Sequence, residues 1–186
     1  MTTTASTAAP AEFRAACQTL NLVRARPEIE FGELPAPTRL APFSHAISAS
    51  VIDETRPHAA SGRLILLYDP DGVSAWEGTL RVVVFLTAGI DEDIAQDVLL
   101  PEVAWSWLGE CLGDRAASYT ALGGTVTATS STRFGDLAGP QRSDDLELRA
   151  SWTATDHGVD RHLAAFVDVL AIAAGLPPEG VTAIGR

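Results

Sequence analysis

The chain of 186 residues carries a net charge of −11, with 13 basic residues against 24 acidic ones. Hydrophobic residues make up 46% and charged residues 20%, which is the balance of an ordinary globular protein with one sizeable core. Because such an acidic surface repels nucleic acid and anionic membranes at long range, direct binding to either is not expected.

Residues 1–10 are rich in threonine and alanine and lack the basic and apolar regions of a signal peptide. We expect them to form a disordered tail, residues 11–180 a single domain, and residues 181–186 a C-terminal tail. The longest apolar runs are too short to span a bilayer, so a cytoplasmic location is expected. Cys17 and Cys111 lie in apolar, helix-like stretches and are interpreted as buried hydrophobic residues.

The first predicted element is a helix over residues 11–23, because apolar residues recur there at helical spacing. Its apolar face would consist of Phe13, Ala16, Cys17 and Leu20. Residues 28–31 alternate in polarity and predict a short edge strand. The proline-rich stretch 26–42 that contains it is expected to lie extended across the surface of the fold.

Three strands are predicted next, over residues 46–52, 63–68 and 79–86. Residues 69–72, Asp-Pro-Asp-Gly, predict a turn between the last two. The second and third strands are apolar on both faces, which is typical of central strands or of strands covered on the second face.

Asp91 is a predicted helix N-cap, and Pro101 suits the first position of a helix that runs to Asp114. In that helix Trp105, Leu108, Cys111 and Leu112 are expected to point inward. Residues 119–130 predict a strand interrupted by a bulge or bend at Gly123-Gly124. Residues 146–154 alternate strictly and predict a strand with Trp152 on its inner face. The last predicted helix starts near Val159 and ends at Gly175.

This order places the strands in adjacent runs joined by short turns, without βαβ alternation. It predicts an α+β fold, a two-layer sandwich with one mostly antiparallel sheet of about five to six strands and helices packed on one face.

Four stretches of this chain resemble the actinobacterial domain-of-unknown-function family 3000. They are LPEVAWSWL at 100–108, YTALGGTVT at 119–127, RASWT at 149–153 and AAGLPP at 173–178. The resemblance covers about residues 11–180 and includes the proline-rich run 26–42. That family has no assigned activity and no known cofactor, so the resemblance carries no catalytic residues over to this chain. Members of that family are often encoded beside a ribonuclease-D-like exonuclease, which implies a cytoplasmic, RNA-related context.

No catalytic, cofactor-binding or metal-binding residues are predicted. His157 and His162 are spaced i, i+5, which is poor for ligands on one helix face, and they are expected to be exposed near the helix start. His45 and His58 are expected in loops. The acidic residues at 91–93, 97 and 102 are interpreted as a solvated helix N-terminus, with a divalent cation as the alternative.

The candidate interaction surface consists of Trp105, Trp107, Arg149, Thr125 and Thr127. The two tryptophans are two residues apart on a helix and are expected to point in different directions, so that one packs inward. The other would meet a ligand, a partner chain or the segment 26–42. Arg149 and the threonines would share a polar sheet face that either binds an extended ligand or a second copy, or is simply solvated.

These observations favour a non-catalytic cytoplasmic binding or adaptor protein, with a protein partner or self-association. Two alternatives stay open. One is an accessory factor of a ribonuclease-D-like RNA-processing enzyme, which would contact the enzyme and not the RNA. The other is a small-molecule enzyme with a pocket between the sheet and the helices.

Overall fold

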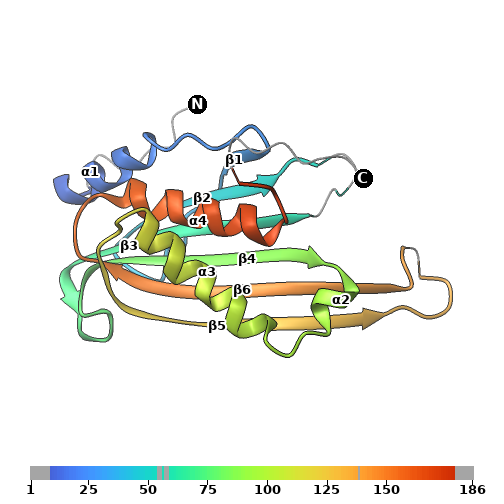
Figure 1. Cartoon of the computed structure of the whole chain (residues 1–186). Coiled ribbons are helices and arrows are strands. Elements are labelled where there is room, and N and C mark those ends of the chain that lie inside the picture. Colours follow the sequence, from blue (N-terminus) through green and yellow to red (C-terminus); the bar gives the residue numbers. More distant parts are fainter. Residues whose placement is uncertain (1–8, 54–55, 57–58, 138, 179–186) are drawn as a thin grey trace.

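A computed structural model of the chain describes residues 9–53, 56, 59–137 and 139–178 (Figure 1). Its helices are α1 (Ala11–Leu20), η1 (Ser74–Trp76, a 3-10 turn), α2 (Glu92–Ala95), α3 (Leu100–Asp114) and α4 (Val159–Ala173). Its strands are β1 (Ile29–Glu33), β2 (Phe43–Val51), β3 (Ala60–Val73), β4 (Gly78–Ile90), β5 (Tyr119–Thr132) and β6 (Arg142–Ala154). The expected tail residues 1–8 and 181–186 lie outside the described part, as does His58, whereas Ala9 is buried and Pro10 directly precedes α1.

The six strands form one antiparallel sheet in the order β1-β2-β3-β4-β6-β5. The α+β class and the mostly antiparallel sheet are therefore confirmed. β1 is an edge strand and β3 and β4 are central, as their residue patterns predict. β6 enters between β4 and β5, so β5 forms the second edge of the sheet (Figure 1).

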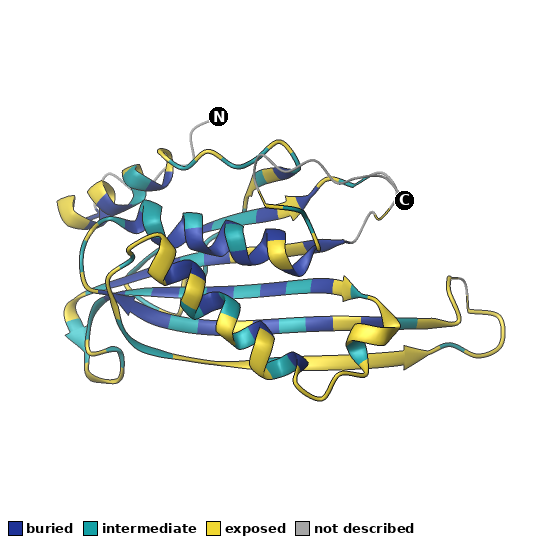
Figure 2. Ribbon diagram, in the orientation of Figure 1, coloured by how far each residue is buried: buried dark blue, intermediate teal, exposed yellow. Residues whose placement is uncertain are grey.

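The helices cover one face of this sheet (Figure 1). α4 lies against β2, β3 and β4, α3 lies against β5 and against α4, and α1 packs on α4. The core forms between these layers, and Figure 2 shows the buried residues along α4 and the middle strands. The largest fully buried side chains include Trp152, Phe166 and Leu64. We call the other side of the sheet, which none of the helices α1 to α4 covers in the described part of the chain, the open face.

The periodicity of the sequence explains most of these elements. In β6 the alternating residues Leu146, Leu148, Ala150, Trp152 and Ala154 are buried, as predicted. In α1 Phe13, Ala16 and Leu20 of the predicted face are buried, whereas Cys17 is only half-buried. The ring centroid of Phe13 lies 5.7 Å from that of Tyr68 and 6.1 Å from that of Phe43. α4 ends before Gly175, whose φ of +69° favours glycine.

The predicted turn at residues 69–72 is wrong. These residues continue β3 through an irregular stretch in which pairing with β4 is interrupted between Tyr68 and Val73. Gly72 has a φ of +75° there, and a proline without an N–H occupies position 70, so the residues form a bulge in place of a hairpin turn. The chain reverses direction beyond this stretch, at η1 (Ser74–Trp76).

Two local predictions are confirmed in position and differ in detail. Asp91 occupies the N-cap of α2, but its side chain makes no capping hydrogen bond. The irregularity in β5 falls between Thr120 and Gly123, with Ala121 at a φ of +50°, so the bulge directly precedes the glycine pair.

Candidate functional site

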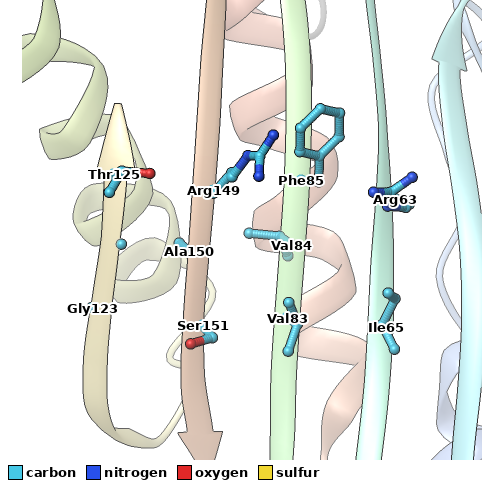
Figure 3. Close-up of a pocket in the computed structure, with 11 residues that line it drawn as sticks. Arg63, Ile65, Val83, Val84, Phe85, Gly123, Thr125, Arg149, Ala150 and Ser151 are labelled. Carbon is cyan, nitrogen blue, oxygen red and sulfur yellow. The ribbon is translucent and has the colours of Figure 1, made fainter. Parts of the chain in front are cut away.

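The open face of the sheet carries a row of side chains that crosses four strands. Arg63 on β3 pairs with Phe85 on β4, Phe85 pairs with Arg149 on β6, and Arg149 pairs with Thr125 on β5. Because directly opposed residues of antiparallel strands point to the same face, these four side chains lie side by side. Figure 3 shows Phe85 between the two arginines.

The two guanidinium groups in this row both stack on the same aromatic ring. The Cζ atom of Arg63 lies 4.8 Å from the centroid of the Phe85 ring, and that of Arg149 lies 5.1 Å from it. A cation over a ring is attracted by the negative face of the ring, which holds both side chains against the sheet. Since both distances are measured to the same ring centroid, the two Cζ atoms lie at most about 10 Å apart, and the two cations repel each other.

A shallow hollow of about 480 Å³ lies next to this row on the open face. Ile65 and Val83 form its apolar bottom, together with Phe85, and Ser151 and Gly123 line the side toward β5 (Figure 3). All three apolar side chains are half-buried, although none of the helices α1 to α4 lies over them. The hollow therefore combines an apolar surface with two cationic groups at one end.

A third arginine, Arg81, lies on the same face, two positions before Val83. It donates hydrogen bonds to Ser151 Oγ at 2.8 Å, to Thr153 Oγ1 at 3.1 Å and to the carbonyl oxygen of Ala121 at 3.0 Å. Burial lowers the pKa of Arg81, whereas the charge of Glu77 acts in the opposite direction. Arg81 thus fixes the bulge of β5 to the rest of the sheet and adds positive charge to the open face.

The charges around the hollow contrast with the net charge of −11 of the whole chain. Arg149 forms an ion pair with Glu147 at 2.7 Å and is largely exposed. Arg63 has no acidic partner among the described residues. Its guanidinium group lies over the Phe85 ring. This arrangement can attract a small anion and hold an apolar group against the bottom of the hollow.

The structure divides the five residues of the predicted interaction surface between the two faces of the sheet. Arg149 and Thr125 line the hollow, and Thr127 lies on the same face opposite Glu147. Trp105 and Trp107 lie on α3, on the face that the helices cover. Arg63, Phe85 and Arg81 belong to the site and were not predicted, because their proximity follows from the strand register.

The expectation that only one of the two tryptophans can pack inward is wrong. Both are half-buried and both pack against the same core cluster. At about 100° per residue, positions two apart can lie on the two sides of one buried stripe, and here that stripe contains Ala104 and Leu108. The stretch 26–42 does not supply the cover, because its strand β1 lies at the sheet edge opposite to β5, where α3 packs.

Trp105 also explains the glycine pair in β5. A Cβ atom on Gly124 would lie 2.8 Å from Trp105 Cζ3 and 2.2 Å from the carbonyl oxygen of Arg149, closer than any side chain allows. The same atom on Gly123 would meet nothing within 4 Å. Gly124 therefore permits the close approach of Trp105 to β5, and Gly123 lines the side of the hollow toward β5 without a side chain to fill it.

The prediction of an exposed His162 is wrong. Its side chain is fully buried on α4, and the indole N–H of Trp152 donates a hydrogen bond of 2.9 Å to His162 Nδ1. His162 Nε2 is buried without a partner within the described residues. Burial lowers the pKa of His162 to about 4, although the charge of Asp156 acts in the opposite direction, so the ring is neutral at pH 7.

A second hollow, of about 540 Å³, lies between α1 and the strands β1 and β2 and is lined by Cys17, His45 and Glu33. His45 is half-buried on β2, not in a loop as expected. Burial raises the pKa of the Cys17 thiol to about 11 and lowers the pKa of His45. Cys17 is therefore a protonated thiol at neutral pH, which is a weak nucleophile.

In the described part of the chain, no three His, Cys, Asp or Glu side chains lie close enough together to hold a metal ion. The acidic stretch around α2 forms contacts within the protein instead. Glu92 accepts a hydrogen bond from Arg142 at 2.7 Å and another from Gln96 at 3.1 Å. Among the described residues, no helix is both long enough and apolar enough to cross a membrane.

Comparison with known proteins gives one match. A family model described as "Protein of unknown function (DUF3000)" matches residues 9–182. No curated protein and no solved structure matches the chain.

Proposed function

The chain belongs to the DUF3000 family, whose description names no activity, and from its own residues we propose that it is a non-catalytic binding protein. Its ligand would be a small organic anion, a carboxylate or phosphate that carries an apolar part. The hollow on the open face would hold it. The observation that supports this most directly is the pair of arginines stacked on Phe85 in a chain of net charge −11.

The chemistry of the hollow matches such a ligand at both ends. An anionic group at this end of the hollow would lower the repulsion between the charges of Arg63 and Arg149 and accept charge-assisted hydrogen bonds. An apolar part on Ile65 and Val83 would cover half-buried hydrophobic surface that water now contacts. A second copy bound face to face would instead place arginines near arginines, which disfavours it as the occupant of this face.

A binding role also agrees with the state of the thiols. Burial raises the pKa of Cys17 to about 11 and that of Cys111 to about 12, so neither is an activated nucleophile. Both cysteines are free, which suits a reducing compartment and supports the proposal of a cytoplasmic location. A role as adaptor of an RNA-processing enzyme rests on the family resemblance alone, and no contact or charge described above favours it.

The proposal is tested by fluorescence titration with 8-anilinonaphthalene-1-sulfonate, an anionic aromatic probe. We expect the probe to bind to the natural protein. Its dissociation constant should be at least about tenfold higher for the double variant Arg63→Gln/Arg149→Gln, because two charge-assisted contacts are lost. Arg133→Gln is a control for the loss of an arginine elsewhere, since Arg133 lies outside the hollow and bonds to the Pro140 carbonyl. Equal binding by all three proteins would show that the hollow is not the site.

A further inference from the structure

The two edges of the sheet differ sharply in length and charge. β1 has five residues, IEFGE, and two of them are glutamates. β5 has 14 residues, YTALGGTVTATSST, with no charged residue and no proline. Natural sheets protect their edges with short strands, charges or prolines, because an edge presents unpaired backbone groups to any other chain. β1 is protected in this way and β5 is not.

The outer edge of β5 is accessible over most of its length. From Gly123 to Thr132 every residue except Val126 is exposed (Figure 2). The strand is rich in threonine, which has high β propensity. Its long run of backbone groups is therefore free to extend the sheet.

Apolar side chains lie next to this edge. α2 and α3 both contact β5, and Figure 1 shows their connecting segment reaching past the strand. Val98 in that segment is 88% exposed and Leu99 is 54% exposed, and Val103 at the start of α3 is 45% exposed. These three side chains would lose contact with water if another polypeptide lay alongside β5.

We propose that β5 pairs with β5 of a second copy of this chain. The two strands would run antiparallel about a twofold axis, so that the two six-stranded sheets become one continuous sheet. Val98, Leu99 and Val103 of each copy would pack against the other copy beside the new strand pair. This interface does not involve the bottom of the hollow and does not depend on the proposed ligand.

The absence of charged residues from β5 allows a second copy to approach along this edge. Two molecules that each carry −11 repel each other, and they can meet closely only along a surface without charge. β5 is such a surface, and it is the same length on both sides of the twofold axis. Since β1 at the other edge is short and acidic, each chain offers one unprotected edge, and pairing stops at a closed dimer.

Light scattering combined with gel filtration tests this proposal across roughly a hundredfold range of protein concentration. We expect the mass of two chains at high concentration. The variant Thr127→Lys/Thr129→Lys places charges on the exposed edge and should raise the dissociation constant at least about tenfold. Its matched control, Ser50→Lys/Ser61→Lys, adds the same charge at exposed positions of the inner strands β2 and β3 and should leave it unchanged.

Amide hydrogen exchange provides a test that needs no variant. Alternate amides among residues 123–132, those whose N–H groups point away from β6, should gain protection as the concentration of the natural protein rises, because they become bonded to the second copy. A single-chain mass at every concentration would refute the proposal. So would a dimer that both lysine variants weaken equally, or concentration-dependent protection confined to elements other than β5.

Discussion

Replacing His162 by glutamine should remove a large part of the pH dependence of stability in this protein. His162 is fully buried and accepts a hydrogen bond from the Trp152 indole at Nδ1. A glutamine side chain can accept the same bond through its oxygen but cannot be protonated in this range. The variant therefore separates the titration of the imidazole from its packing.

The size of the effect follows from the pKa. In the unfolded chain His162 has a pKa near 6.5, and in the folded protein burial lowers it to about 4. Because the unfolded state binds the proton first, stability is fully present above the unfolded pKa and is lost as the pH falls from 6.5 toward 4. At about 1.4 kcal/mol per pH unit, the loss is about 2 kcal/mol by pH 5 and about 3 kcal/mol by pH 4.

Urea unfolding followed by tryptophan fluorescence measures this at several values of pH. We expect the free energy of unfolding of the natural protein, relative to that of His162→Gln, to fall by about 2 kcal/mol between pH 7 and pH 5. Asp156, Asp160 and Arg161 lie near the imidazole and are present in both proteins. Parallel curves for the two proteins would refute the assignment of a depressed pKa to His162.

Three further outcomes are expected. Gly124→Ala should lower the free energy of unfolding by about 2–3 kcal/mol because its Cβ atom meets backbone atoms, whereas Gly123→Ala should cost less than about 1 kcal/mol, and equal losses in urea unfolding would contradict this. Arg81→Met should speed amide exchange at residues 119–123, since Arg81 bonds to the bulge of β5, while exchange in α4 stays unchanged. Cys17 and Cys111 should resist alkylation at mildly alkaline pH until urea unfolds the protein, because burial raises the pKa of both thiols; rapid labelling of the folded protein would show that they are accessible thiolates.

The elements with a strict period could be predicted from the sequence. In β6 buried and more exposed residues alternate over residues 146–152. α4 repeats its apolar residues at helical spacing and ends shortly before a glycine. The prediction of a turn at residues 69–72 was wrong because Pro and Gly are as suitable for a bulge as for a turn. Which of the two forms depends on the partner strand β4, whose pairing resumes beyond it.

Half of the candidate site could be predicted and half could not. Arg149, Thr125 and Thr127 were found because β5 and β6 both alternate and were expected to be neighbours. Arg63 and Phe85 lie on strands far apart from these in the chain, and only the register of β3, β4 and β6 brings them to Arg149. The available signal was the apolar second face of β3 and β4, which is only partly covered.

The wrong expectation for His162 has a simple physical cause. The helical pattern of α4 places His162 beside Leu163 and one turn before Phe166, on the buried side. A histidine there is stable only if a buried donor or acceptor meets its ring, and that partner is Trp152, ten residues earlier on β6. Local sequence cannot show such a pair before the strand and the helix are packed together.

The place of α4 as the last helix of the described chain has a consequence for synthesis on the ribosome. α4 covers β2, β3 and β4. β4 also pairs with β6, which is synthesised after it. A nascent chain that has completed only these earlier strands presents their inner leucines and valines to the cell without a cover. The core can therefore close only after translation has passed residues 159–173, and until then the growing chain is a target for chaperones and proteases.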